Sequence, residues 1–290
     1  METLLKDLEN LSNRWASAQV DSLVAELRRG KVPSSPFGST DGGQIDLRGI
    51  SVNEPVILSG GSLAGVDFSH ARLSKLLCVK ATISDCKFDN SEMVFLGNDS
   101  KVYRSSFNEA RLATSGSTGM TEFNECSFNK TDLTGGMFKQ GRFFACKFSE
   151  ATLDRVEFGE SVIEASEVAG SLSKCFFRGP IKQCDLTEAT FLDCAFYGAL
   201  FIDCRVSDHA LVIESWPEVF ASICGDLDSG ALSLKTANAL RKACAVWSKL
   251  TGVIMQNLID RRDFEKSYGS QVAGELFAYL TDVKRRVGES

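Results

Sequence analysis

The chain carries an apolar residue at almost every fifth position across its middle part. The clearest run is Phe123, Phe128, Leu133, Phe138, Phe143, Phe148, Leu153, Phe158, Ile163 and Val168. A five-residue period fits neither an α-helix, with about 3.6 residues per turn, nor a β-strand, whose side chains alternate. It indicates an internal repeat, which extends from about residue 45 to residue 213.

The residues around each apolar centre are also patterned. The side chain two positions before a centre is usually small, and a polar residue often stands directly before the centre, as in the units VDFSH, CKFDN, TDLTG, CKFSE, ATLDR and CDLTE. These units resemble those of the pentapeptide-repeat family, roughly Ala-(Asp/Asn)-Leu-x-x. The resemblance implies a mainly β fold, a right-handed four-sided parallel β-helix with one pentapeptide on each side and about twenty residues in each coil.

Stacking of such coils can be checked within the sequence. If about twenty residues close one coil, residues at that separation lie on neighbouring layers. Similar residues recur at this spacing, in the pairs Phe68/Phe88, Phe123/Phe143, Phe128/Phe148, Leu133/Leu153, Phe138/Phe158, Phe191/Leu211, Cys126/Cys146 and Cys184/Cys204. We therefore expect about eight coils, and at ~4.8 Å per layer a rod about 40 Å long.

The same repeat accounts for most of the ten cysteines. Seven stand at the small position, namely Cys86, Cys126, Cys146, Cys175, Cys184, Cys194 and Cys204, and Cys78 stands at a centre. Buried Cys behaves there as a small hydrophobic residue. The sequence has no Cys-x-x-Cys pair, and His70 and His209 are isolated, so we expect no metal site and no cofactor. The roles of Cys224 and Cys244, outside the repeat, are left open.

The period changes phase three times. Phe107 follows Met93 one residue early, Leu112 and Phe123 are eleven residues apart, and Val168 and Phe176 are eight apart. The Ser- and Gly-rich stretch in the second interval predicts a short protruding loop. Because rigid scaffolds often carry binding residues on loops, the candidate partner-binding residues are Ser115, Gly116, Ser117, Thr118 and Gly119. The alternative is a tolerated one-residue insertion.

Helical segments are predicted on both flanks of the repeat. Residues 1–44 comprise a helix over 1–29 and a Gly-, Pro- and Ser-rich linker, and the helix would cap the first coil, whose core is otherwise open. Residues 214–290 lose the five-residue period. They predict a helix that begins at Ser215-Trp216-Pro217-Glu218 and ends at Gly225, and two more over 234–259 and 270–287. This region is expected to be a helical cap or a dimerisation element.

Composition and motifs favour a non-enzymatic protein. The 290 residues have a net charge of −6, no apolar run long enough to span a membrane, and an N-terminus unlike a signal peptide, so we expect a cytoplasmic protein without membrane contact. Nucleophile-elbow, Walker, dinucleotide-binding and zinc-protease motifs are absent from the sequence. Residues 226–230 begin like a calcium loop, but Asn238 stands near the position where a bidentate Glu is needed.

The family resemblance implies a protein partner rather than direct nucleic-acid binding. Some bacterial pentapeptide-repeat proteins bind DNA gyrase or topoisomerase IV, type II topoisomerases, and protect them from inhibitors, with an acidic rod that mimics duplex DNA. Residues 45–213 carry 17 Lys and Arg against 22 Asp and Glu, a net charge of only −5. Duplex DNA about 40 Å long carries on the order of 20 or more negative charges.

Three other roles stay open at this point. The chain could be a scaffold or effector-type protein that acts through its C-terminal helices. It could be an immunity protein that blocks a toxin. It could also form a homodimer through residues 214–290.

Overall fold

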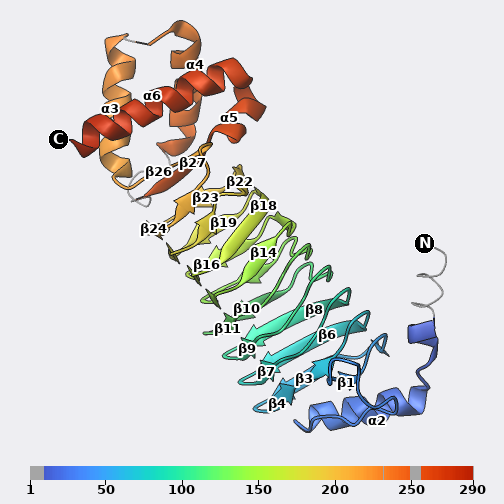
Figure 1. Cartoon of the computed structure of the whole chain (residues 1–290). Helices are drawn as coiled ribbons and strands as arrows, with labels where there is room; N and C mark the ends of the chain where they lie inside the picture. The colour runs from blue at the N-terminus through green and yellow to red at the C-terminus, as the bar shows by residue number, and fades with distance from the viewer. Residues whose placement is uncertain (1–9, 231, 249–255, 290) are drawn as a thin grey trace.

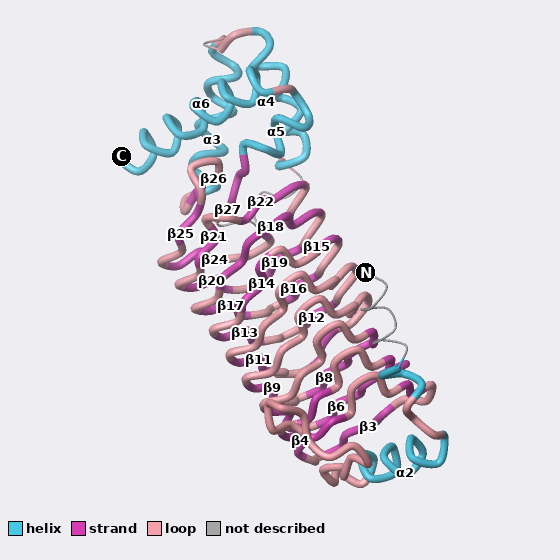
Figure 2. Tube along the Cα trace, turned by 45° about the vertical axis from the view of Figure 1, so that its right-hand side comes forward, coloured by secondary structure: helices cyan, strands magenta, loops and turns pink. Residues whose placement is uncertain are grey.

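The computed structural model describes residues 10–230, 232–248 and 256–289. It is a rod with a parallel β-solenoid in the middle, helix α2 (Ser17–Arg28) at one end and a group of helices at the other (Figure 1). The strands stack as successive rungs, joined by corner segments (Figure 2). The predicted parallel solenoid of about eight coils with helical flanks is confirmed.

Each coil has four sides, and the strands of one side pair in parallel from coil to coil. Side 1 holds β1 (Ile45–Asp46), β5 (Val66–Asp67), β14 (Lys147–Ser149), β18 (Glu167–Ser173), β21 (Asp185–Leu186) and β25 (Arg205–Val206). Side 2 holds β2 (Ser51–Val52), β6 (Arg72–Val79), β8 (Glu92–Asn98), β15 (Leu153–Asp154) and β22 (Ala189–Leu192). Strand β18 continues from side 1 onto side 2, and β6 and β8 continue from side 2 onto side 3.

The remaining strands complete sides 3 and 4. Side 3 holds β3 (Val56–Ser59), β10 (Gly116–Thr118), β12 (Met137–Phe138), β16 (Glu157–Gly159), β19 (Phe176–Arg178) and β23 (Ala195–Phe196). Side 4 holds β4 (Ser62–Ala64), β7 (Thr82–Ser84), β9 (Lys101–Tyr103), β11 (Glu122–Asn124), β13 (Arg142–Phe144), β17 (Val162–Glu164), β20 (Pro180–Lys182) and β24 (Leu200–Ile202). The pairing divides the solenoid into coils 1–8, which comprise residues 45–65, 66–85, 86–104, 105–125, 126–145, 146–165, 166–183 and 184–203.

One central residue from each coil points into the core on every side. Side 1 contributes Leu47, Phe68, Phe88, Phe107, Phe128, Phe148, Val168 and Leu186. Side 2 contributes Val52, Leu73, Met93, Leu112, Leu133, Leu153, Leu172 and Phe191. Side 3 contributes Leu58, Cys78, Gly97, Ser117, Phe138, Phe158, Phe177 and Phe196. Side 4 contributes Leu63, Ile83, Val102, Phe123, Phe143, Ile163, Ile181 and Phe201.

Left-handed residues form most of the corners. Twenty described non-glycine residues, from His70 to Asp203, have positive φ, and each lies two positions after a centre. A single left-handed residue turns the chain sharply, which the corner requires. Lys75 and Phe95 occupy equivalent positions without a positive φ, because β6 and β8 run across this corner as unbroken strands.

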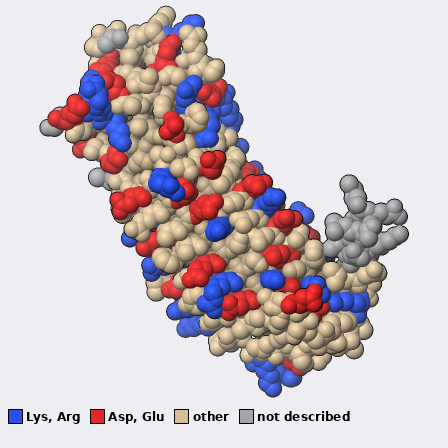
Figure 3. Space-filling view, in the orientation of Figure 1, with Lys and Arg blue, Asp and Glu red and all other residues tan. Residues whose placement is uncertain are grey.

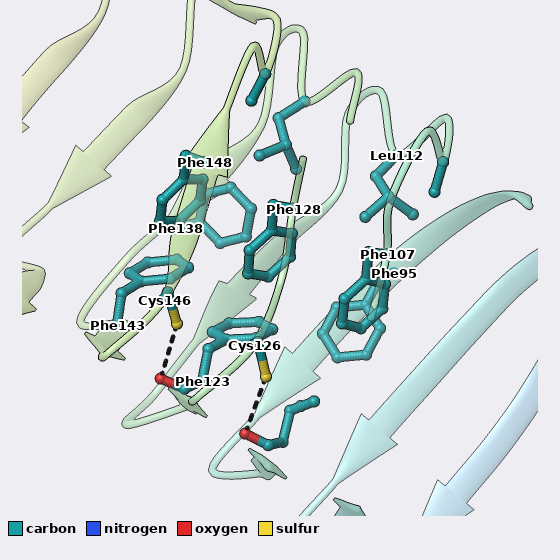
Figure 4. Packing of buried hydrophobic residues seen from close by; sticks show 14 of the residues in the cluster. Phe95, Phe107, Leu112, Phe123, Cys126, Phe128, Phe138, Phe143, Cys146 and Phe148 are labelled. Carbon is teal, nitrogen blue, oxygen red and sulfur yellow. Dashed lines mark hydrogen bonds between the residues drawn. The ribbon is translucent and has the colours of Figure 1, made fainter. Parts of the chain in front are cut away.

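The aromatic ladders follow the predicted stacking. On side 1 the rings of Phe88, Phe107, Phe128 and Phe148 stack successively, with centroids 4.9, 5.1 and 5.0 Å apart. Figure 4 shows Phe107, Phe128 and Phe148. The predicted Phe68/Phe88, Phe123/Phe143 and Phe138/Phe158 pairs are also stacked. The Phe191/Leu211 pair is wrong, because Leu211 lies in β26 (Ala210–Ile213), which leaves the solenoid and pairs antiparallel with β27 (Asn257–Asp260).

The cysteines of the repeat pack as small buried residues. Cys126 Sγ and Cys146 Sγ donate to the carbonyls of Val102 and Phe123, which lie 24 and 23 residues earlier in the chain, both at 3.4 Å (Figure 4). Burial raises the pKa of Cys78 and of Cys86 to about 12. All ten cysteines are free thiols. Outside the repeat, Cys244 is buried in the helical core and Cys224 is half-buried.

Two phase changes differ from the sequence expectation. The repeat unit after Met93 is one residue short, and the shortening falls between Met93 and Phe95. The Phe95 side chain enters the core beside Phe107 and Phe123. After Val168 the chain loses one residue before the next centre and another between Phe177 and Ile181. The core residue is therefore Phe177, 3% exposed, whereas Phe176 points outward against Tyr197, with centroids 4.9 Å apart.

The N-terminal segment closes the first coil. Leu23, Val24 and Leu27 of α2 join the solenoid core. The single helix expected over residues 1–29 is wrong, because the helix breaks at residues 14–16; residues 1–9 lie outside the described part. Arg14 donates to both carboxylate oxygens of the buried Asp46. Burial opposes ionisation of Asp46, but hydrogen bonds from Arg48 and Arg14 outweigh it and hold its pKa well below the usual range.

In the described part of the chain after the solenoid, four helices pack around a second core. They are α3 (Trp216–Ser229), α4 (Leu234–Trp247), α5 (Arg261–Tyr268) and α6 (Ser270–Gly288). The predicted helix start at Ser215 is confirmed, but α3 ends at left-handed Gly230 rather than at Gly225. The helix expected over 234–259 ends at Trp247, and its last residues form strand β27 instead. Residues 226–230 close α3 and do not form a calcium loop.

Side chains from residues 256–263 cap the open edge of coil 8. The buried Asp260 carboxylate accepts a hydrogen bond from the Phe191 amide at 2.9 Å and pairs with Arg262 at 2.7 Å. Arg262 also donates to the Ala189 carbonyl at 2.6 Å. Asp263 and Gln256 accept from two further edge amides, those of Asp193 and Phe201. Unpaired edge strands invite association, and this segment closes the edge.

Candidate interaction surface

The predicted partner-binding segment does not form a protruding loop. Ser115, Gly116 and Ser117 are buried within the solenoid wall, and Ser115 Oγ accepts a hydrogen bond from the Phe95 amide at 2.9 Å. The expectation of a loop was wrong because these small residues make room in the core, where Phe95 occupies a position that is normally small. Thr118 is exposed and Gly119 half-buried on side 3. Partner binding by this segment stays a prediction.

The extra residue of coil 4 lies just after this segment. Gly119, Met120 and Thr121 connect side 3 to side 4, and the Met120 amide donates to Asp99 Oδ1 at 3.1 Å. The Met120 side chain is 74% exposed. The insertion thus adds an apolar side chain to the surface beside Thr118.

A ladder of apolar side chains runs along the outside of side 3. Ile57 pairs in register with Leu77, Leu77 with Leu96, Leu96 with Gly116, and Gly116 with Met137. These residues stand directly before the centres, a position that is often polar elsewhere in the repeat. Ile57 and Met137 are 41% and 49% exposed, and Leu77 and Leu96 are half-buried. Val79 extends the apolar area within β6.

The unbroken strands β6 and β8 join this ladder to side 2. Figure 1 shows them as long arrows across the lower half of the rod. A groove of about 540 Å³ lies along side 2 of coils 1–4, and its lining includes Arg72, Ser74, Glu92, Val94 and Arg111. We call the outward residues of β3, β6, β8 and β10, together with this groove, the β6–β8 surface.

Exposed apolar residues elsewhere are more scattered. Leu200 and Ile202 lie on side 4 of coil 8, and Leu234 and Val246 lie far apart along α4. Contiguous exposed apolar patches mark interaction sites, whereas single apolar residues are ordinary surface features. The β6–β8 surface is therefore the strongest candidate for protein contact in the described part of the chain.

The charged residues do not form an acidic side. Every side carries both signs, and opposite charges pair between neighbouring coils, as in Arg104–Asp85, Arg142–Glu164 and Arg205–Asp185. Figure 3 shows red and blue side chains interspersed along the visible face. The acids Glu150, Asp154, Glu157, Glu160, Glu164 and Glu167 follow one turn around the rod and so spread over all four sides.

The described residues contain no candidate metal site. No group of three or more His, Cys, Asp or Glu side chains there could hold a metal ion. Asp226, from the stretch that resembles a calcium loop, accepts hydrogen bonds from Tyr279 and Arg286 instead. Among the described helices none combines the length and apolar character of a membrane span.

The solved structures similar to this chain include two pentapeptide-repeat or antibiotic-resistance proteins. Neither a family model nor a curated protein matches the sequence. The structure is similar to HetL, a pentapeptide-repeat protein involved in heterocyst differentiation regulation in the cyanobacterium Nostoc sp., with 15% identity, a TM-score of 0.28, and coverage of 57% of this chain and 90% of HetL. It is also similar to trypsin-treated QnrB1, a plasmid-mediated fluoroquinolone resistance protein, with 16% identity, a TM-score of 0.30, and coverage of 62% and 95%.

The fold assignment rests on the register of the chain's own coils. Four centres per coil, small residues two positions before them and left-handed corners two positions after them recur through eight coils. The chain therefore has the pentapeptide-repeat fold, a four-sided parallel β-solenoid with one five-residue unit on each side.

Proposed function

We propose that the chain is a non-enzymatic protein-binding rod that docks a protein on its β6–β8 surface. The in-register ladder of Ile57, Leu77 and Leu96 carries this proposal. Burying apolar area is worth about 25 cal/mol per Å², so a protein that covers these side chains gains binding free energy. The solenoid holds them on a rigid scaffold, so little conformational entropy is lost on binding.

A photo-crosslinking amino acid at position 77 tests this proposal. We expect it to form a covalent adduct with protein in the cells that make the chain. The control places the same amino acid at Val162, a half-buried apolar residue on side 4. Adducts of equal yield at both positions, or none at Leu77, would contradict docking on the β6–β8 surface.

A type II topoisomerase is the partner that the family resemblance suggests. DNA mimicry would require a continuous acidic side, and the alternating charges on all four sides do not support it. A gyrase supercoiling assay with and without a quinolone tests this candidate directly. Unchanged supercoiling in both conditions would exclude it, and protection from the quinolone would establish it together with a role in antibiotic resistance.

Dimerisation through the C-terminal helices also stays a prediction. These helices expose few large apolar residues in their described part, and residues 256–263 close the edge of coil 8. Deleting residues 214–290 would open that edge and alter the fold of the rod. Oligomeric state is therefore better tested with single substitutions in the full chain.

A further inference from the structure

We propose that the protein docked on the β6–β8 surface is a second copy of this chain, packed face to face with its rod antiparallel. This inference rests on the proposed function and names its partner. The charges that flank the apolar ladder carry it. Lys80 and Asp99 stand at the corner between sides 3 and 4, in coils 2 and 3, and Arg72 and Glu92 stand on side 2 of the same coils.

Most of these four charged side chains are not paired among the described residues and are therefore available to a partner. In the described part of the chain, Arg72 and Lys80 make no ion pair. Asp99 accepts only the Met120 amide and has no cationic partner there. Glu92 pairs with Arg111 at 3.4 Å, but both side chains are more than half exposed, and such pairs are weak. Within coils 2 and 3, each edge of the surface therefore carries one positive and one negative charge, while Arg111 in coil 4 and Lys75 between the edges add further positive charge.

Two copies of one surface meet through a two-fold axis in the plane between them. If the axis ran along the rod, each coil would face its own copy with the two edges exchanged. Arg72 would then lie opposite Lys80 of the second copy, and Glu92 opposite its Asp99. Like charges directly opposite each other are unfavourable, so the charge pattern disfavours parallel rods.

A two-fold axis perpendicular to the rod, between coils 2 and 3, places opposite charges against each other. Coil 2 then faces coil 3 of the second copy, and coil 1 faces its coil 4. Lys80 lies opposite Asp99, Arg72 opposite Glu92, and Leu77 opposite Leu96. Ile57 lies opposite Gly116, which is buried in the solenoid wall and adds no side chain to the contact. Each contact occurs twice by symmetry.

Neighbouring registers do not share this complementarity. An axis through coil 2 places Lys80 against Lys80 and Arg72 against Arg72. An axis through coil 3 places Asp99 against Asp99 and Glu92 against Glu92. The charges thus favour one register among the antiparallel arrangements of this surface, as charge patterns do in specific interfaces.

Light scattering on the full chain, over a range of concentrations, tests the pairing. We expect a dimer, and we expect Lys80→Glu to weaken it by about tenfold or more, since each dimer gains two like-charge contacts. The double variant Lys80→Glu/Asp99→Lys should restore the dimer. Both positions are exposed, but Asp99→Lys also removes the acceptor of the Met120 amide, so circular dichroism has to show that both variants are folded. A monomer at every concentration, or a double variant as weak as the single one, would overturn the inference.

The crosslink at position 77 separates this inference from the proposed function. An adduct of twice the chain mass supports the second copy. An adduct with a different protein overturns the second copy and leaves docking on the β6–β8 surface standing. No adduct overturns both.

Discussion

Replacing Asp260 with alanine is expected to lower the free energy of unfolding by about 3–5 kcal/mol. The carboxylate is buried, accepts the Phe191 amide of the last coil and pairs with Arg262. Its removal leaves an unpaired edge amide and a guanidinium that is largely shielded from water. Urea denaturation followed by circular dichroism measures the loss.

The matched control is Asp208→Ala, which removes an exposed carboxylate close to the same end of the solenoid. We expect that change to stay within about 0.5 kcal/mol. Equal losses for the two variants would show that Asp260 does not close the solenoid. Asp260→Asn should fall between them, because it keeps an acceptor oxygen but loses the charge opposite Arg262.

Replacing Phe177 with alanine is expected to cost about 3–5 kcal/mol, as for other buried phenylalanines. Its ring stacks between those of Phe158 and Phe196, with centroids 5.1 and 5.2 Å away. The adjacent Phe176→Ala is the control, because Phe176 points outward and loses mainly its contact with Tyr197. That loss is expected to be about 1 kcal/mol. A larger loss of unfolding free energy for Phe176→Ala than for Phe177→Ala would support the register expected from the sequence, in which Phe176 lies in the core.

The five-residue period predicted most of the core because two inward positions recur in every unit. The period predicted the core wrongly where a large side chain occupies a position that is usually small. At Phe95 a large residue takes the small position, so Gly97 and Ser117 become the small ones, and a Ser- and Gly-rich stretch that looked like a loop is buried. Near Phe177 two repeat units are each one residue short. A five-residue spacing applied to the sequence treats the two changes as one, which places Phe176 instead of Phe177 in the core.

The interaction surface and the C-terminal cap could be predicted only in part. Ile57, Leu77 and Leu96 are visible as apolar residues, but their in-register stacking depends on coil lengths that vary along the chain. The pairing of β26 with β27 joins residues about fifty positions apart, and nothing local indicates it. The burial of Asp260 against Arg262 depends on this long-range pairing, so the local sequence does not indicate it.

The most direct test of the antiparallel docking on the β6–β8 surface is a crosslink between two differently labelled chains. One chain carries Lys80→Cys, the other Asp99→Cys, and a short bifunctional maleimide joins cysteines that lie close together. We predict a crosslinked heterodimer in the mixture and little product from either variant alone, because position 80 faces position 99 of the second copy. Equal crosslinking of each variant with itself, or no product in the mixture, would contradict this account.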